Sequence, residues 1–154
     1  MYKRQRKHIR DETNALLNNV HKVLKPDGLL ICEFGADGNI ATIENAFKKV
    51  CLNSGLEFNA KFNFPTSEHF SDLLKANGFI IDKIYDFDRP TTLKDNESGL
   101  ANWMKQFYAS ELDLLSENAR NEIIKKVEDL KRKSLWSGKE WIVDYRRLRV
   151  VAHI

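Results

Sequence analysis

The pattern of apolar and polar positions divides the chain into alternating helices and strands. Residues Thr13 to Lys25 have the spacing of an amphipathic helix with one buried stripe, which Pro26 and Gly28 end. The run Leu29 to Glu33 is apolar without alternation until its final glutamate, which predicts a strand covered by helices on both faces. The stripe of the helix consists of Leu16, Leu17, Val20, Val23 and Leu24.

Two more helices and a strand are expected in the middle of the chain. Asn39 is the candidate N-cap of the first of these helices. Either Thr66 or Ser67 could cap a second, short helix that ends before Gly78, and Phe79 to Tyr85 follows as a strand. The apolar face of the first helix consists of Ile43, Ala46, Phe47, Val50 and Cys51.

The last third of the chain begins with a helical pair. One helix is expected from Ser98, and a longer one runs from its cap Ser116 to about Lys133. The segment Trp141 to Ala152 is rich in β-branched and aromatic residues, which predicts the final strand. The order helix, strand, helix, helix, strand, helical pair, strand indicates an α/β fold.

The composition is that of one ordinary globular domain. The 154 residues are 42% apolar and 31% charged, which excludes a disordered or collagen-like chain. No apolar run approaches the roughly 20 residues that cross a bilayer, and no secretory signal is visible. We therefore expect a cytoplasmic protein without membrane contact. Cys32 and Cys51 have the spacing of neither a zinc site nor a disulfide framework, and we expect core thiols.

Positive charge is concentrated at the N-terminus, although the net charge is only +3. Residues 1–12 form a basic arm of the kind that attracts phosphate backbones, but only Tyr2 is available there to stack on a base. We therefore favour a solvated terminus and expect no nucleic-acid binding. The basic residues are Lys3, Arg4, Arg6, Lys7 and Arg10.

Several segments together resemble a known family. The stretch Val23 to Ile31, with Lys-Pro-Asp-Gly at its centre, resembles the junction between a helix and the fifth strand in class I S-adenosylmethionine-dependent methyltransferases. From about Leu16 to its end, the chain looks like the C-terminal half of the trans-aconitate methyltransferase-like branch. The further matching segments, in order, are Phe64-Pro65-Thr66, Leu73-Leu74, Gly78-Phe79, Arg89-Pro90-Thr91, Gly99-Leu100 with Trp103 and Phe107, and Asp144 to Ala152.

The resemblance implies a partial Rossmann-like methyltransferase sheet of three strands. These strands would be the fifth, sixth and seventh of the family, so their expected order is first, third, second, with the last strand antiparallel. Flanking helices would cover the sheet, and a helical insertion would precede the last strand. Residues 13–154 would then form a methyltransferase-like C-terminal half-domain.

The cofactor-binding features of the family are absent from this sequence. A complete member has a Gly-x-Gly type loop and an acidic residue that holds the ribose. The only close glycine pair here, Gly35 and Gly38, follows the strand that resembles the fifth. The resemblance implies S-adenosylmethionine for the parent family, but we assign no cofactor-binding residue and expect the chain alone to bind none.

The strand Leu29 to Glu33 is expected to have an open edge. In a complete sheet the fourth strand would pair with it, so its outer edge would be open in this chain. An unpaired apolar edge favours the addition of another strand. We therefore predict a homo-oligomer, or a complementing chain, joined through Leu29 to Glu33.

Six residues are candidates for binding a small-molecule acceptor. Glu33 ends its strand where ligand crevices open, and Phe64 and Trp103 could wall a pocket. Polar residues of the last strand could fix a carboxylate. The ordinary alternatives are ion pairs for the arginines and a core position for Trp103. The candidates are Glu33, Phe64, Trp103, Tyr145, Arg147 and Arg149.

No metal site is expected, because His21 and His69 lie outside any array with metal-ligand spacing, so both are expected at the surface or its boundary. The sequence thus predicts a methyltransferase-like chain whose parent reaction methylates a small molecule, with a carboxylic acid as one candidate acceptor. Without the cofactor half, we expect no catalysis by the chain alone. One alternative is a non-catalytic interaction module that pairs through its sheet edge and uses the basic arm to bind nucleic acid or an acidic partner. Another is a segment of a longer enzyme.

Overall fold

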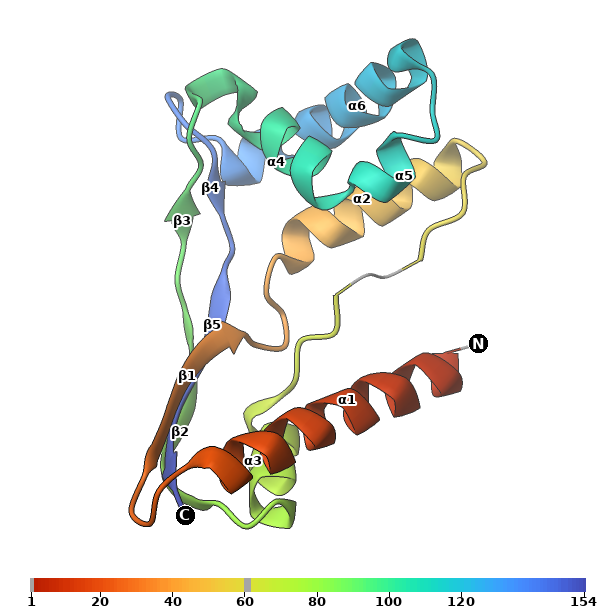
Figure 1. Ribbon diagram of the computed structural model, residues 1–154. Coiled ribbons are helices and arrows are strands. Elements are labelled where there is room, and N and C mark those ends of the chain that lie inside the picture. Colours follow the sequence, from red (N-terminus) through yellow and green to blue (C-terminus); the bar gives the residue numbers. More distant parts are fainter. Residues whose placement is uncertain (1, 60–61) are drawn as a thin grey trace. The chain divides into compact units, whose positions relative to one another are not determined.

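The computed structural model describes residues 2–59 and 62–154, and the side chains of residues 12–59 and 62–154. Contacts divide the chain into two compact units, each built from stretches that are separate in sequence (Figure 1). Unit 1 consists of Met1–Asn39, Phe62–Asp88 and Arg146–Ile154, and unit 2 consists of Ile40–Lys61 and Arg89–Tyr145.

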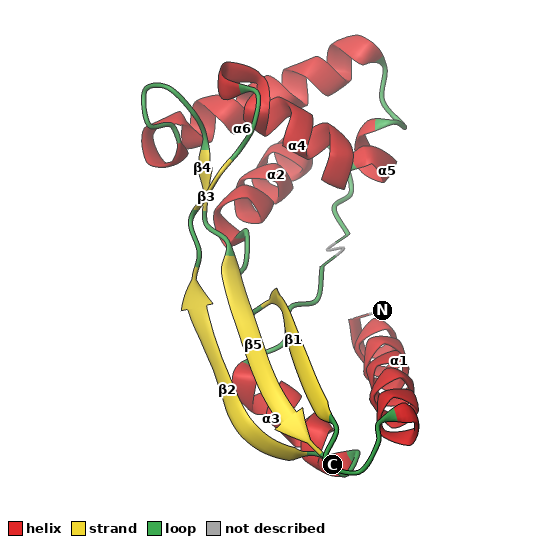
Figure 2. Ribbon diagram, turned by 60° about the vertical axis from the view of Figure 1, so that its left-hand side comes forward, coloured by secondary structure: helices red, strands yellow, loops and turns green. Residues whose placement is uncertain are grey.

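Unit 1 contains a three-stranded sheet. Its strands are β1 (Leu29–Gly35), β2 (Ile80–Asp88) and β5 (Arg146–His153), in the order β1-β5-β2 (Figure 2). The last strand lies in the centre and is antiparallel to both neighbours. This arrangement confirms the predicted order of first, third, second and the predicted direction of the last strand.

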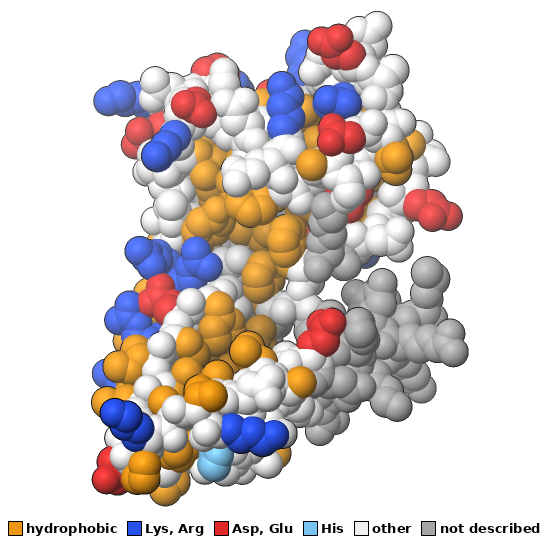
Figure 3. Space-filling model, in the orientation of Figure 1, with side chains coloured by type: hydrophobic (Ala, Val, Ile, Leu, Met, Phe, Trp, Pro, Cys, Tyr) orange, Lys and Arg blue, Asp and Glu red, His pale blue; other side chains and the backbone are white. Residues whose placement is uncertain are grey.

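Two helices cover one face of this sheet. They are α1 (Tyr2–Val23) and α3 (Ser67–Ala76). Alternate residues of β5 point toward them, because side chains alternate between the two faces of a strand. Figure 3 shows hydrophobic side chains gathered in the lower half of its view, where Figure 1 places these elements. The core consists of Leu17, Ala36, Phe70, Leu73, Leu74, Phe79, Leu148, Val150 and Ala152.

The opposite face of the sheet is more open than the sequence predicted. Leu29 is 56% exposed, Ile31 is 67% exposed and Ile80 is 59% exposed. The prediction that helices cover both faces of β1 is therefore wrong for the part of the chain that the structure describes. The physical reason is that α1 and α3 both pack on the face that carries Leu30 and Cys32.

The first helix is longer than the apolar pattern indicated. Its backbone is helical from Tyr2, so α1 includes most of the predicted basic arm. The side chains of residues 1–11 lie outside the described part of the chain. The basic arm over residues 1–12 and its charges therefore stay a prediction.

Unit 2 is mainly helical. It contains α2 (Ala41–Asn53), α4 (Gly99–Phe107), α5 (Ala109–Leu112) and α6 (Glu117–Leu135). A 3-10 turn, η1 (Asn96–Ser98), leads into α4, and the short strands β3 (Thr91–Thr92) and β4 (Ile142–Val143) form a separate pair. In the core of this unit, the rings of Phe47 and Tyr108 stack with centroids 4.2 Å apart.

The predicted final strand, Trp141 to Ala152, is broken into β4 and β5. Asp144 lies at the break, and its hydrogen-bonding groups serve α2 instead of a strand ladder. Its carbonyl accepts from the Ile40 amide at 3.0 Å, and its Oδ2 accepts from the Thr42 amide at 2.9 Å. The carboxylate thus caps the first turn of a helix that is distant in sequence, which strand propensity cannot reveal.

The helix caps were predicted with mixed success. Thr66 caps α3, and the cap of α6 is Ser116, as expected. Asn39 does not cap α2, because its Oδ1 accepts a hydrogen bond from the Arg146 amide at 2.8 Å. The N-cap position of α2 is Ile40, which has a left-handed backbone with φ of 55°. This conformation is rare for a β-branched residue and is held by the surrounding structure.

Candidate binding cavity

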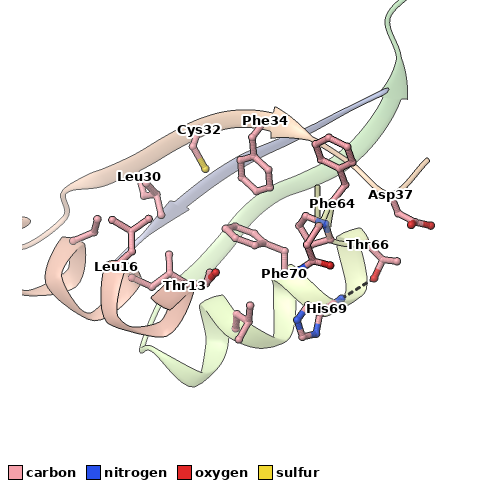
Figure 4. Close-up of a pocket in the computed structure, with 15 residues that line it drawn as sticks. Thr13, Leu16, Leu30, Cys32, Phe34, Asp37, Phe64, Thr66, His69 and Phe70 are labelled. Atoms are coloured by element: carbon pink, nitrogen blue, oxygen red, sulfur yellow. Dashed lines mark hydrogen bonds between the residues drawn. The ribbon is translucent and has the colours of Figure 1, made fainter. Parts of the chain in front are cut away.

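A cavity of about 890 Å³ lies inside unit 1, between α1, β1 and α3 (Figure 4). Its lining residues come from segments 13–20, 30–37 and 63–73. Small-molecule sites in proteins measure about 300–1,000 Å³. The cavity is therefore large enough for a small molecule and is the candidate functional site of this unit.

Most of the cavity wall is apolar. Alternation along β1 directs Leu30, Cys32 and Phe34 to one side of the strand, where Figure 4 shows them facing the cavity. Phe70 of α3 meets Phe34 edge to face, with ring centroids 4.8 Å apart. The lining residues from α1 are Thr13, Leu16, Leu17 and Val20.

Polar lining groups lie near the carboxyl end of β1. Asp37 follows β1, whereas Asn63, Thr66 and His69 belong to the segment that enters α3 (Figure 4). The Asp37 amide donates to the Pro65 carbonyl at 3.0 Å, which joins the two segments. A bound molecule would therefore contact apolar walls along its body and polar groups at one end.

Thr66 positions the first turn of α3 at this polar end. Its Oγ1 accepts a hydrogen bond from the His69 amide at 3.1 Å (Figure 4). The bond satisfies an amide that has no partner within the helix. The place of His69 beside the cavity thus follows from a local capping interaction, although its side chain is exposed.

Phe64 packs directly on the backbone of Gly35 at the end of β1. A Cβ atom added at Gly35 would lie 2.4 Å from Cε1 and 2.5 Å from Cδ1 of the Phe64 ring. Phe62 supports the ring from another side, with stacked centroids 5.6 Å apart. The missing side chain at position 35 therefore lets this aromatic ring form part of the cavity wall.

Arg146 anchors the loop that follows β1. Its carbonyl accepts from the Ala36 amide at 3.0 Å, and its amide donates to Asn39. Its guanidinium forms ion pairs with Asp86 and, at 2.7 Å, with Asp88. The hydrogen bond that Arg146 donates to Asp86 is the main reason that the pKa of Arg146 is raised. The central strand thus holds the loop at the polar end of the cavity.

Cys32 presents its thiol to the cavity (Figure 4). Burial raises the pKa of this thiol, and both cysteines are free. The prediction of a core thiol is confirmed for Cys51, which is 3% exposed. Cys32 is instead half-buried, because it packs against the edge of the core and also lines the cavity.

Two of the predicted site residues pair on the opposite face of the sheet. Glu33 and Arg149 are neighbours in the β1–β5 register, and Arg149 Nε donates to Glu33 Oε2 at 2.8 Å. The hydrogen bond with Glu33 is the main reason that the pKa of Arg149 is raised. Arg147 shares this face by alternation. These three residues are therefore turned away from the cavity.

The remaining two aromatic candidates meet in unit 2. The Trp103 Nε1 donates to the Tyr145 hydroxyl at 2.8 Å. Trp103 is only 7% exposed and packs against Phe107, with ring centroids 4.7 Å apart. Of the six predicted residues, Phe64 alone lines the cavity. The structure places the other five in a cluster on the outer sheet face and in a pair within unit 2.

Asp37 and His69 are polar residues of the cavity that the sequence analysis did not select. Asp37 is the first acidic residue after β1, and strand carboxyl ends are where ligand crevices open. The position of Asp37 could therefore have identified it as a site residue from the sequence. For His69 the sequence offers only its place in the first turn of a capped helix.

Within residues 12–59 and 62–154, whose side chains the structure describes, no three His, Cys, Asp or Glu side chains are grouped so that they could hold a metal ion. None of the helices described in that part of the chain has the length and apolarity needed to cross a membrane.

Comparison with known proteins gives one curated relative with a function in its name. No family model matches the sequence. Uncharacterized methyltransferase C70.08c of Schizosaccharomyces pombe is 28% identical over 148 residues, which cover 90% of this chain and 54% of the yeast protein. The chain therefore spans about half the length of this relative.

A solved structure shares the fold. The crystal structure of a proposed methyltransferase from Bacillus halodurans C-125 has a TM-score of 0.52 and 11% identity, covering 91% of this chain and 62% of that chain. Likeness at this identity concerns the fold alone. Together the two comparisons indicate a methyltransferase fold with a small antiparallel sheet and flanking helices. The trans-aconitate branch stays a prediction.

Proposed function

We propose that this chain forms the acceptor-binding part of an S-adenosylmethionine-dependent methyltransferase, with a small-molecule acceptor in the cavity under β1. The observation that carries the proposal is the cavity itself, which combines apolar walls with polar groups near the carboxyl end of β1. Ligands of open α/β sheets bind outside strand carboxyl ends. The name of the yeast relative supports methyl transfer and gives no support to the alternative of a non-catalytic interaction module.

The chemistry proposed for the parent reaction requires little from the protein beyond positioning. In the parent enzyme S-adenosylmethionine would supply the methyl group, and the cavity residues of this chain would hold the acceptor. Such a reaction is accelerated mainly by orientation and by a site of suitable polarity. In this chain the apolar walls would exclude water, and the polar groups beside Asp37 would orient the acceptor.

The close glycine pair, Gly35 and Gly38, does not fit the cofactor. The Gly35 backbone is covered by the Phe64 ring, so it cannot approach a phosphate or a nucleoside. Gly38 faces the Arg146 side chain, with 3.7 Å between a virtual Cβ and Cδ of Arg146. We therefore derive no step through S-adenosylmethionine, and we propose that these residues alone do not bind it or catalyse the reaction.

A carboxylic acid is the second candidate acceptor. Its support is the placement of Arg147 and Arg149 at alternate positions of β5, on the same sheet face. An acid at Arg149 would compete with Glu33, which already accepts hydrogen bonds from the guanidinium. This candidate therefore requires exchange of one carboxylate for another on the outer face of the sheet.

We also propose that β1 is the edge through which the chain associates with a second copy. Both outer strands of the sheet have an open edge in the described part of the chain. β2 has a register shift near Lys83, and it also carries Asp82, Asp86 and Asp88, features that discourage strand addition. β1 has Glu33 as its single charge.

The proposed function is tested with a chimera. The segment of the yeast relative that matches this chain is replaced by the matching residues, and methyl incorporation from labelled S-adenosylmethionine into a small-molecule filtrate of yeast extract is measured. We expect the chimera to methylate the same small-molecule acceptors as the yeast protein. A folded chimera that binds the cofactor but methylates nothing, beside an active yeast control, would contradict the proposal.

The proposed lack of cofactor binding has a separate test. Calorimetric titration of the 154-residue chain with millimolar S-adenosylmethionine should give only the heat of dilution. Saturable heat would show that the residues described here hold the cofactor, against the argument from Gly35 and Gly38.

A further inference from the structure

The charges around the cavity are unequal. Of the lining residues that the structure describes, Asp37 alone has a carboxylate and none is Lys or Arg. Among the lining residues that the structure describes, the Asp37 carboxylate is therefore the one permanent charge at the polar end of the cavity.

The Asp37 carboxylate is available to a ligand. The residue is exposed, and its backbone is fixed by the bond from its amide to the Pro65 carbonyl. Within the described part of the chain, no Lys or Arg forms an ion pair with Asp37, whereas Asp86 and Asp88 are both engaged by Arg146. Asp37 thus differs from the other carboxylates at this end of the sheet.

The apolar wall sets the size of the molecule that would reach Asp37. Leu30, Cys32 and Phe34 face the cavity along β1. Four residue steps of a strand extend over about 13 Å, which matches an extended chain of roughly ten carbons. A molecule that fills this wall would therefore be elongated and largely apolar.

We propose that the cavity binds an amphiphilic cation, with an apolar body along β1 and an ammonium group beside Asp37. This inference rests on the proposed function, because it names the chemical class of the acceptor for the same cavity. A carboxylate at the head position would be repelled by Asp37, so the inference opposes an acidic acceptor in this cavity. The effect of one exposed charge is modest, about three- to fivefold in affinity.

The thiol of Cys32 provides a direct probe of occupancy. In a Cys51→Ala variant Cys32 is the only cysteine, because the chain contains two. Alkylation by iodoacetamide at alkaline pH is followed by mass spectrometry while decylammonium, 1-decanol or decanoate is added at low ionic strength. The three probes share one apolar chain and differ in the charge of the head group.

We expect decylammonium to protect Cys32 at concentrations about three- to fivefold lower than 1-decanol, and decanoate to protect least. In Asp37→Asn the ammonium and the alcohol should protect equally. The matched control is Asp72→Asn, the same substitution at an exposed residue of α3 that does not line the cavity, and it should keep the ammonium preference. Equal or better protection by decanoate, an unchanged ranking in Asp37→Asn, or no protection by any probe would overturn the inference.

The alkylation assay can fail or succeed separately from the test of the proposed function. The alkylation assay contains no S-adenosylmethionine and measures no turnover. Protection by decylammonium together with an inactive chimera would leave the cavity as a cation site and remove methyl transfer. An active chimera together with no preference for the ammonium probe would support methyl transfer and remove the cation site.

Discussion

At the scale of single residues, Gly35 and Phe64 show how a missing side chain shapes a site. The ring occupies the space that a Cβ atom would need, with separations of 2.4 and 2.5 Å to two ring carbons. Gly35 does not have a positive φ. A glycine is therefore needed at this position because the Phe64 ring approaches the backbone closely, and not because the backbone requires the conformational freedom of glycine.

Gly35→Ala should lower the free energy of unfolding by about 1–3 kcal/mol, because the ring must move from its packed position. The measurement is urea unfolding of the wild type, the two single variants and the double variant with Phe64→Ala. In the Phe64→Ala background the cost of Gly35→Ala should shrink, since the clash is gone. An unchanged cost in that background would show that the ring is not the obstacle.

Cys51 should make stability depend on alkaline pH. Burial, with a smaller contribution from Glu111, raises its pKa from 9.0 to about 11. The unfolded chain loses this proton first, so the stabilisation is complete below pH 9 and is lost as pH rises toward 11. We expect a loss of about 1–2 kcal/mol over this range.

The measurement for Cys51 is the free energy of unfolding in urea at several pH values from below 9 to 11. Cys51→Ala is the matched variant, because it keeps a small apolar side chain without a titrating group. The difference between wild type and variant should fall as pH rises. Parallel profiles would contradict the assigned role of Cys51.

Some site residues were predictable one by one and others were not. Phe64 came from its position in the matched loop, and the shared face of Arg147 and Arg149 followed from strand alternation. The pairing of Arg149 with Glu33 joins residues 116 positions apart in sequence. No local pattern determines such a pair, since it depends on which strands become neighbours.

At the scale of elements, the start of α3 is a test of capping. Both Thr66 and Ser67 satisfied the sequence pattern, and the structure selects Thr66, whose Oγ1 accepts from the His69 amide at 3.1 Å. Thr66→Ala should cost about 1 kcal/mol of stability in urea unfolding. Ser67→Ala is the neighbouring control and should cost less than about 0.5 kcal/mol. Equal costs would contradict the assignment of the cap.

The elements themselves were largely predictable where periodicity was strong. α6 and its cap were expected, because its apolar stripe is long and Ser116 stands at its start. The break at Asp144 and the engagement of Asn39 by β5 were not. Both involve a polar side chain that serves a distant segment, and local propensity contains no information about that segment.

At the scale of the whole molecule, strand order came from the family resemblance and not from the apolar pattern. Periodicity alone gives three strands without their neighbours, whereas the resemblance implied that the last strand lies antiparallel in the centre, as the β1-β5-β2 order confirms. The division into two units was not expected, because their segments alternate along the chain.

Association through β1 should be sensitive to charge on its open face. Ile31 is 67% exposed, and Ile31→Lys should weaken self-association of the chain by placing an ammonium group beside the open edge. Sedimentation velocity over a concentration series measures the effect. Ile80→Lys on β2 is the matched control and should leave association unchanged. A wild-type chain that stays monomeric, or equal effects of both variants, would contradict association through β1.

The central position of β5 has a consequence for the order of events in the cell. Leu29 and Ile80 both pair with His153. The ribosome synthesises β5 after β1 and β2, so neither outer strand can pair in the sheet until β5 has been made. Until residues 146–153 leave the exit tunnel, the two earlier strands have no ladder partner within unit 1. Sheet formation in this unit is therefore a late event, and nascent chains would expose β1 and β2 to chaperones while translation continues.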